Sequence, residues 1–443
     1  MYDLIVIGAG PGGYEAAAHA GKMGKKVAVV EKQHIGGTCL NVGCIPTKAF
    51  LRSSRFYSEC RHAADYGIRI GEPQFDMTAV LARKNRIVGT LTRGVDGLLK
   101  RAGVEVIRGH GRLAGRDAVR VGDTTYSARN ILIATGSRPA APPIAGIESP
   151  GILDSTSALD LSEIPSSIAI IGGSYIGLEF ACFFGSVGSK VTVLEMLPQI
   201  AGSVDEEIAK RLHQALTKMG AEIKTSCQVM AIDGSMVHYT GGSLSAERVL
   251  NATGRVPVTD GLGLEETGVD FDRRGIRTSE RGKTNIPGVW ACGDVTGRLQ
   301  LAHAATREGL VAVNNMFGAA DRIRYEAIPA VIYTHPEVAC VGKTERELKE
   351  QGIEYRSSKV PMAVSGRFLI EHEGASGFVK VLAGARYGEI LGVHAIGDGA
   401  SEFIAAAAAM IETEMSVSDV DRIVFPHPTI SEALKQAVLE IKL

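Results

Sequence analysis

The sequence predicts an α/β protein with two similar β-α-β units, followed by a C-terminal segment of the α+β type. Two observations predict the repeated unit: a glycine-rich turn follows an apolar strand near the N-terminus, and a similar pattern returns 164 positions later. The third observation is the order of expected elements after about residue 322, where a strand and a helix precede two strands and two helices. With 443 residues, 53 of them glycine, the chain can bury more than one core and should divide into several domains.

The first unit begins with an apolar strand over residues 5–7 that runs into Gly8, Gly10 and Gly13 in GxGxxG spacing. An alanine-rich helix is expected from about Tyr14, then a second strand over 26–30 that ends at Glu31. Such glycines let the backbone approach a pyrophosphate at the helix N-terminus, and the acidic residue can bind ribose hydroxyls. The whole pattern therefore predicts a Rossmann-like dinucleotide-binding domain rather than an ordinary glycine-rich turn.

The second unit matches the first at 11 positions when residues 5–31 are compared with 169–195. Gly172, Gly177 and Glu195 repeat the key positions, whereas Ser174 replaces the central glycine, so the close approach of a pyrophosphate is less certain there. Two dinucleotide sites in one chain imply electron transfer between two cofactors. The alternative is a second copy that serves only packing.

Cys39 and Cys44 are separated by four residues and precede a helix start at Pro46. Thiols close to a helix N-terminus and to a lysine, here Lys48, ionise more easily, and the thiolate is the form that exchanges with disulfides. The pair is therefore a candidate redox-active disulfide, with two buried reduced cysteines as the alternative. The other cysteines are expected to stay as thiols: Cys60, Cys182, Cys227, Cys292 and Cys340.

The charge balance, with 48 basic against 49 acidic residues and no long run of either sign, argues against nucleic acid or an anionic membrane as partner. The longest apolar helix-like run, residues 403–411, is far too short to span a bilayer and should be a core helix with Ser401 as its N-cap. Because the first strand begins at Tyr2, no targeting segment is expected, and the predicted location is cytoplasmic.

The motifs together resemble the flavin-dependent pyridine nucleotide-disulfide oxidoreductases, and within that family the dihydrolipoamide dehydrogenase branch. The stretch from Gly36 to Lys48, which holds both cysteines, is similar to the active-disulfide motif of that branch nearly letter for letter. Further similar motifs cover the rest of the chain: 134–136, 251–255, 289–294, 333–338 and 427–432.

The resemblance implies an order of domains. An FAD-binding domain would span 1–144 and return over 260–321, an NAD-binding domain would span 145–259, and 322–443 would form the interface of a homodimer. The pattern of this last segment predicts a strand over 330–333, a helix opened by a capping box of Thr344 and Glu347, strands over 378–382 and 391–395, and two further helices.

The resemblance also implies roles for particular residues. Cys39 would exchange thiols with the substrate, and Cys44 would lie against the flavin as a thiolate. Lys48, four residues beyond Cys44 on the same helical face, would pair with Glu179 and hold positive charge near that thiolate, unless it is simply a solvated surface lysine. The residues expected to bind the two cofactors, FAD and NAD, are Gly8, Gly10, Gly13, Glu31, Lys48, Thr135, Gly136, Asp294, Gly172, Gly177, Glu195 and Gly254, with no metal site.

His427 is the candidate base that takes a proton from the thiol substrate, and Glu432 would orient it. The alternative is that Glu432 serves only the backbone, as part of a capping box that begins at Thr429. His427 lies 383 positions beyond Cys44, in the segment that resembles a dimer interface, so it would act on the disulfide of the other subunit.

The function implied by the resemblance is oxidation of protein-bound dihydrolipoamide by NAD through the disulfide and FAD. The partner would be the lipoyl domain of a 2-oxoacid dehydrogenase complex or the glycine cleavage H protein. Related glutathione-like or mercuric reductase-like activities remain open, although residues 438–443 lack the cysteine pair of a mercuric reductase and Glu195 disfavours a 2′-phosphate. A flavoprotein scaffold with little turnover is the alternative from another class.

Overall fold

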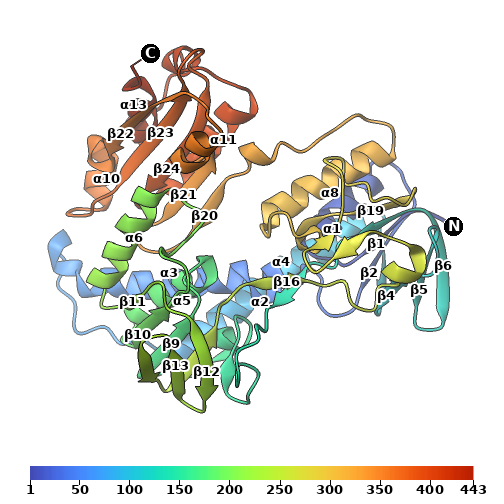
Figure 1. Ribbon diagram of the computed structural model, residues 1–443, viewed down its shortest axis with the longest axis horizontal. Coiled ribbons are helices and arrows are strands. Elements are labelled where there is room, and N and C mark those ends of the chain that lie inside the picture. Colours follow the sequence, from blue (N-terminus) through green and yellow to red (C-terminus); the bar gives the residue numbers. More distant parts are fainter. Residues whose placement is uncertain (443) are drawn as a thin grey trace.

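The computed structural model describes residues 1–442, whose larger sheets are one of seven strands and two of five strands (Figure 1). Leu443, the last residue of the expected interface domain, lies outside the described residues. Within residues 1–442, no helix is both long enough and apolar enough to cross a membrane. The mixed α/β architecture confirms the predicted fold class.

The first sheet has the order β3-β2-β1-β6-β5-β4, with β19 paired to β6. Its strands are β1 (Tyr2–Ile7), β2 (Val27–Glu31), β3 (Glu105–Arg108), β4 (Gly111–Leu113), β5 (Ala118–Val121), β6 (Thr124–Ile133) and β19 (Val289–Ala291). Helix α1 (Pro11–Lys22) begins three residues before the expected Tyr14, because Pro11 has no N–H to lose and suits the first helical position. Strand β19 lies parallel to β6, so a segment distant in sequence completes this sheet.

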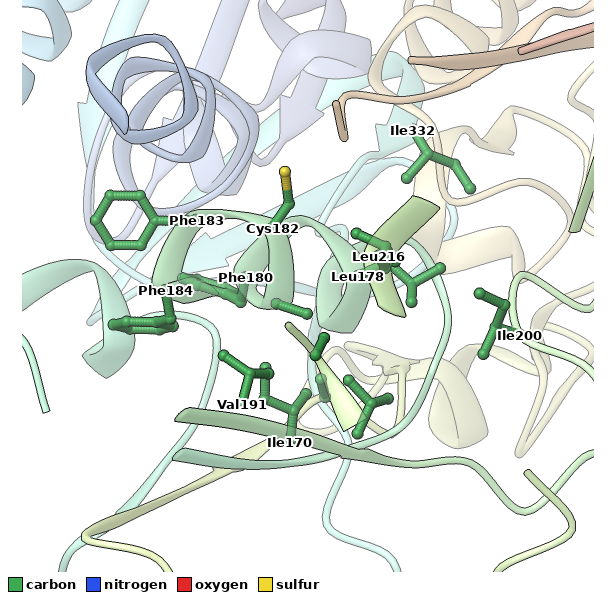
Figure 2. Packing of buried hydrophobic residues seen from close by; sticks show 14 of the residues in the cluster. Ile170, Leu178, Phe180, Cys182, Phe183, Phe184, Val191, Ile200, Leu216 and Ile332 are labelled. Carbon is green, nitrogen blue, oxygen red and sulfur yellow. The ribbon is translucent and has the colours of Figure 1, made fainter. Parts of the chain in front are cut away.

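The second sheet is parallel throughout, with the order β11-β10-β9-β15-β8, whereas β4, β5 and β6 of the first sheet pair antiparallel. Its strands are β8 (Ile152–Leu153), β9 (Ser167–Ile171), β10 (Lys190–Leu194), β11 (Glu222–Lys224) and β15 (Arg248–Asn251). Helix α5 (Tyr175–Ser186) lies over these strands, and Figure 2 shows its side chains Phe180 and Phe184 above Ile170 and Val191. The helix is apolar on nearly all sides because a second helix covers its other face.

That second helix is α3 (Cys44–Arg61), and the ring of Phe50 stacks on Phe183 of α5 with 4.9 Å between centroids. Both rings are almost fully buried. Aromatic pairs of this kind contribute about 0.5–1.5 kcal/mol beyond the area they bury. The stacking therefore holds α3, which carries Cys44 and Lys48, against α5, which carries Glu179.

The third sheet is antiparallel, with the order β20-β21-β24-β23-β22, and lies in the orange to red part of Figure 1. Its strands are β20 (Ala330–Ile332), β21 (Val338–Gly342), β22 (Tyr355–Pro361), β23 (Phe378–Gly384) and β24 (Ile390–Ile396). Helix α9 (Glu345–Glu350) confirms the predicted capping box, since the Thr344 hydroxyl and the Glu347 carboxylate each bond the other residue's backbone N–H.

Two expectations for this segment are wrong. Up to residue 442, three helices follow the last strand, not two: α11 (Ala400–Glu412), α12 (Val417–Asp421) and α13 (Glu432–Leu439). The N-cap of α11 is Gly399 rather than Ser401, because Gly399 adopts φ +86° and ends the preceding turn, while the Ser401 N–H bonds the Glu337 carboxylate.

The remaining elements connect the three sheets or lie on them. The helices are α2 (Gly37–Val42), α4 (Met77–Arg101), α6 (Glu206–Lys218), α7 (Leu264–Thr267), α8 (Ala302–Met316) and α10 (Gly366–Glu371). The strands are β7 (Ser137–Pro139), β12 (Val229–Asp233), β13 (Met236–Tyr239), β14 (Gly242–Ser245), β16 (Arg255–Pro257), β17 (Phe271–Asp272) and β18 (Gly275–Ile276). In Figure 1, α6 lies between the second sheet and the third.

Candidate active site

One cavity of about 1930 Å³ runs from the glycine turn after β1 to the glycine turn after β9, and the cysteine pair lies between the two turns. Its lining includes many of the expected site residues: Gly8, Gly10, Glu31, Cys39, Cys44, Lys48, Thr135, Gly136, Glu179, Gly254 and Asp294. A second group, Gly13, Gly172, Gly177 and Glu195, lies behind this lining and shapes the turns. The cavity therefore connects both glycine turns to one dithiol.

The first glycine turn is shaped by close backbone packing. A Cβ on Gly13 would lie 1.9 Å from the carbonyl oxygen of Gly8, so only glycine fits there. The Glu31 carboxylate accepts hydrogen bonds from the N–H of Ala9 at 2.8 Å and of Gln33 at 2.7 Å. Gly10 is the N-cap of α1 and supplies no side-chain cap, so the helix N-terminus stays open to an anion.

The second turn repeats these contacts 164 positions later. A Cβ on Gly177 would lie 1.9 Å from the Gly172 oxygen, and Glu195 accepts from the N–H of Gly173 at 2.6 Å and of Leu197 at 2.8 Å. Ser174 is the N-cap of α5 with φ −98° and ψ −168°, close to the −74° and −179° of Gly10. The serine therefore keeps the backbone geometry of the turn.

Between the first turn and the cysteines, Asp294 follows β19 and accepts a hydrogen bond from the Ser137 hydroxyl. Burial raises the pKa of the Asp294 carboxyl, and the Ser137 hydroxyl and the charge of Arg255 oppose that rise. A half-buried carboxylate with acceptor capacity left over suits the hydroxyl groups of a ligand. An open helix N-terminus, an acidic residue at the end of β2 and this carboxylate together fit the pyrophosphate, ribose and ribityl groups of FAD.

Both cysteines are free thiols in this structure, as are the five others. Cys44 is the first residue of α3 and Cys39 lies in α2. Interaction with the Cys39 thiol, helped by the charge of Lys48 and opposed by burial, lowers the pKa of Cys44 to about 7. The same interaction and burial raise the pKa of Cys39. The reduced pair therefore shares its charge unequally, with the thiolate at Cys44.

Lys48 forms an ion pair with Glu179, and its Nζ lies 2.8 and 2.7 Å from the two carboxylate oxygens. Burial acts to lower the pKa of Lys48, but the charges of Glu179 and Cys44 outweigh it, and the pKa is raised. Glu179 also accepts from the backbone N–H of Tyr333 at 3.0 Å, and the Lys48 ammonium lies 4.6 Å from the centre of the Tyr333 ring. The sequence reasoning did not assign Tyr333 to the site, although it begins one of the motifs that carry the resemblance.

Replacing Lys48 and Glu179 should move the pKa of Cys44 in opposite directions. Lys48→Met removes a charge that lowers this pKa and should raise it by roughly one pH unit, whereas Glu179→Gln removes a charge that raises it and should lower it. The rate of Cys44 alkylation in the reduced protein, followed against pH by mass spectrometry, measures the midpoint. Arg52→Met, an exposed change on the same helix, is the control. Shifts in the same direction for both variants would contradict this electrostatic account.

His427 and Glu432 do not line the cavity among the described residues. The His427 side chain is 78% exposed, and its Nδ1 lies 2.9 Å from Oε1 of Glu432, while Oε2 accepts from the Thr429 N–H. One carboxylate oxygen of Glu432 thus contacts the histidine and the other serves the backbone, so the alternative in which Glu432 serves only the backbone is wrong. Helix α13 starts at Glu432 with Ser431 as its N-cap, so Thr429 does not cap it as the box alternative required.

A dithiol that shares one cavity with two glycine turns of the dinucleotide-binding type fits the class of two-electron dithiol oxidoreductases. Two family models cover nearly all of the chain: pyridine nucleotide-disulphide oxidoreductase over residues 2–309, and its dimerisation domain over 328–438. The chain belongs to the pyridine nucleotide-disulphide oxidoreductase family. Members of this family use FAD together with NAD or NADP, and the dimerisation domain supports a homodimer.

Among curated proteins, the chain is 43% identical to dihydrolipoyl dehydrogenase 3 of Pseudomonas aeruginosa, covering 99% of this chain and 98% of that protein. It is 40% identical to the mitochondrial dihydrolipoyl dehydrogenase of Pisum sativum, with 99% and 91% coverage. Among solved structures it resembles LpdA from Mycobacterium tuberculosis, with a TM-score of 0.91, 25% identity and coverage of 98% and 99%. It also resembles the HOCl-induced flavoprotein disulfide reductase RclA from Escherichia coli, with a TM-score of 0.89, 28% identity and full coverage of both chains.

Proposed function

We propose that this chain oxidises dihydrolipoamide to lipoamide and reduces NAD to NADH, through Cys39, Cys44 and FAD. The observation that carries the proposal is the dithiol, with its low-pKa Cys44, in one cavity with both nucleotide-binding turns. The full-length similarity to proteins named dihydrolipoyl dehydrogenase supports this substrate. Bound FAD supplies an acceptor that takes two electrons from the dithiol and returns them as a hydride to NAD.

In the oxidised protein, Cys39 and Cys44 form a disulfide. His427 holds a hydrogen bond to Glu432 through Nδ1, which leaves Nε2 free to take the proton of the substrate thiol. The substrate thiolate attacks the sulfur of Cys39, the bond between Cys39 and Cys44 breaks, and Cys44 leaves as a thiolate. The second substrate thiolate then attacks the mixed disulfide and releases Cys39, so that lipoamide and a reduced pair remain.

The low pKa of Cys44 favours this direction of exchange, because a thiol of lower pKa is the faster leaving group. The ammonium of Lys48, held by Glu179, lowers that pKa further. Their contribution is electrostatic and requires no proton transfer by Lys48 itself. Glu179 is 96% buried, whereas 31% of the Lys48 side chain is exposed, so water screens part of the attraction between the two charges.

The exposed position of His427 supports a composite site. The histidine lies in the dimerisation domain with most of its surface free, and the cavity of its own chain does not include it. A homodimer would cover this exposed side chain and place it over the disulfide of the partner subunit. We propose that the electron-donating partner is a lipoyl domain, either of a 2-oxoacid dehydrogenase complex or of the glycine cleavage system.

The purified FAD-containing dimer should form NADH when dihydrolipoamide and NAD are supplied. Matched assays with reduced glutathione, with glutathione disulfide plus NADPH and with mercuric ion plus NADPH test the related activities. The kcat/KM for dihydrolipoamide should be higher than that for each of the other substrates. The enzyme should also prefer NAD over NADP, because Glu195 opposes a 2′-phosphate. A higher kcat/KM with any of the other substrates would overturn the proposal.

A further inference from the structure

Lys380 lies outside the cavity yet is among the most buried cations of the described residues. It is on β23 in the dimerisation domain, and 3% of its surface is exposed. Its Nζ lies 3.2 and 3.0 Å from the carboxylate oxygens of Asp205, 2.9 Å from Glu207 and 2.9 Å from Glu345. An isolated buried ammonium would be costly, and these three carboxylates compensate it.

The carboxylates around Lys380 come from two different domains. Glu345 is in the first turn of α9, within the dimerisation domain. Asp205 and Glu207 are at the start of α6, which follows the second glycine turn in the sequence and lies outside that domain. The ammonium therefore joins β23 to the N-terminus of α6, in the region where Figure 1 shows α6 between two sheets.

Asp205 directly follows the loop of residues 195–204, which lies beside the second glycine turn. Its carboxylate caps α6 by accepting from the Glu207 N–H at 3.0 Å. The Ala201 N–H of this loop donates to the Gly173 carbonyl of the second turn at 2.7 Å. Within the loop, the Val204 N–H donates to the Ala201 carbonyl at 2.8 Å. Ser203 in the same loop lies 3.3 Å from the Tyr175 hydroxyl, and both side chains line the cavity.

We propose that Lys380 is a positioning residue for the nicotinamide nucleotide: from the dimerisation domain, it fixes Asp205 and thereby the loop of residues 195–204 beside the second glycine turn. The loop needs such an anchor because Ala201 has φ +50°, a conformation that a residue with a Cβ adopts only when its surroundings hold it there. This inference rests on the use of NAD in the proposed function, but not on the identity of the thiol substrate.

Three single variants of the FAD-containing dimer, and the double variant of Lys380→Met with Asp205→Asn, test the proposal. Lys380→Met removes the ammonium. Asp205→Asn removes the negative charge that faces this ammonium from α6 but keeps a side chain that can cap the helix. Lys359→Met is the matched control, because Lys359 is the cross-strand neighbour of Lys380 on β22, contacts Glu207 and is 53% exposed. Calorimetric titration gives the Kd for NADH, and stopped-flow reduction of the disulfide by dihydrolipoamide gives the rate of the thiol half-reaction.

Lys380→Met and Asp205→Asn should each raise the Kd for NADH by roughly tenfold or more, with the thiol half-reaction unchanged. The double variant should show less than the product of the two effects, because the residues act through one contact. Lys359→Met, which removes only the exposed ion pair with Glu207, should change the Kd by about twofold at most. An unchanged Kd in Asp205→Asn, even with a lower melting temperature, overturns the proposal. If the wild-type dimer binds no NADH, the use of NAD fails instead, which separates the two claims.

Discussion

A mixed dimer of one Cys39→Ser subunit and one His427→Gln subunit should regain activity that neither parent homodimer possesses. General-base assistance contributes roughly 100- to 10,000-fold, and without Cys39 the substrate has no disulfide to attack, so each parent should be nearly inactive. If His427 serves the disulfide of the partner, the mixed dimer contains one site with both residues intact and one with neither. Activity of about half the wild-type value per mixed dimer is then expected.

The measurement requires subunit exchange, confirmation of the mixed species by native mass spectrometry, and the assay with dihydrolipoamide and NAD. Exchange between two differently tagged Cys39→Ser homodimers is the control for effects of the exchange procedure. Mixed dimers that stay as inactive as both parents would show that His427 does not act across the interface. The exposed His427 side chain would then need another explanation.

The second large effect is expected at the two tight glycines, where one chemical change should remove a different cofactor in each case. A Cβ at Gly13 or at Gly177 would lie 1.9 Å from a backbone oxygen, far inside van der Waals contact, so the turn must open. Gly13→Ala should therefore yield protein with little bound FAD and lower stability. Gly177→Ala should keep FAD but lose most of its affinity for NADH.

The ratio of flavin absorbance to protein absorbance measures the first loss, and calorimetric titration of the FAD-containing protein with NADH measures the second. Gly94→Ala is the control, because this glycine is in helix α4 and a Cβ there would meet nothing within 4 Å among the described residues. Alanine in a helix should be neutral or slightly stabilising. If Gly177→Ala lost FAD and Gly13→Ala did not, the assignment of the two turns would be reversed.

The local features of the chain could be predicted from the sequence because they depend on neighbouring residues. The glycine turns and the acidic residues that follow β2 and β10 recur 164 positions apart, and the structure gives them matching hydrogen bonds at both places. The capping box of Thr344 and Glu347 is likewise a property of four consecutive residues. Helix α1 begins at Pro11 rather than near Tyr14, because proline suits the first position of a helix.

What only the tertiary structure decided is which distant side chains meet. Tyr333 contacts Lys48 and Glu179, and Lys380 reaches Asp205 across 175 positions, although no periodicity or short motif links these residues. Such contacts depend on how the domains pack against one another. That packing depends on many buried apolar side chains acting together, such as Phe50 of α3 against Phe183 of α5. The sequence by itself therefore determined the family of chemistry, its cysteines and, through the resemblance, the pair of Lys48 and Glu179. The packing of the domains determined the contacts of Tyr333 and of Lys380.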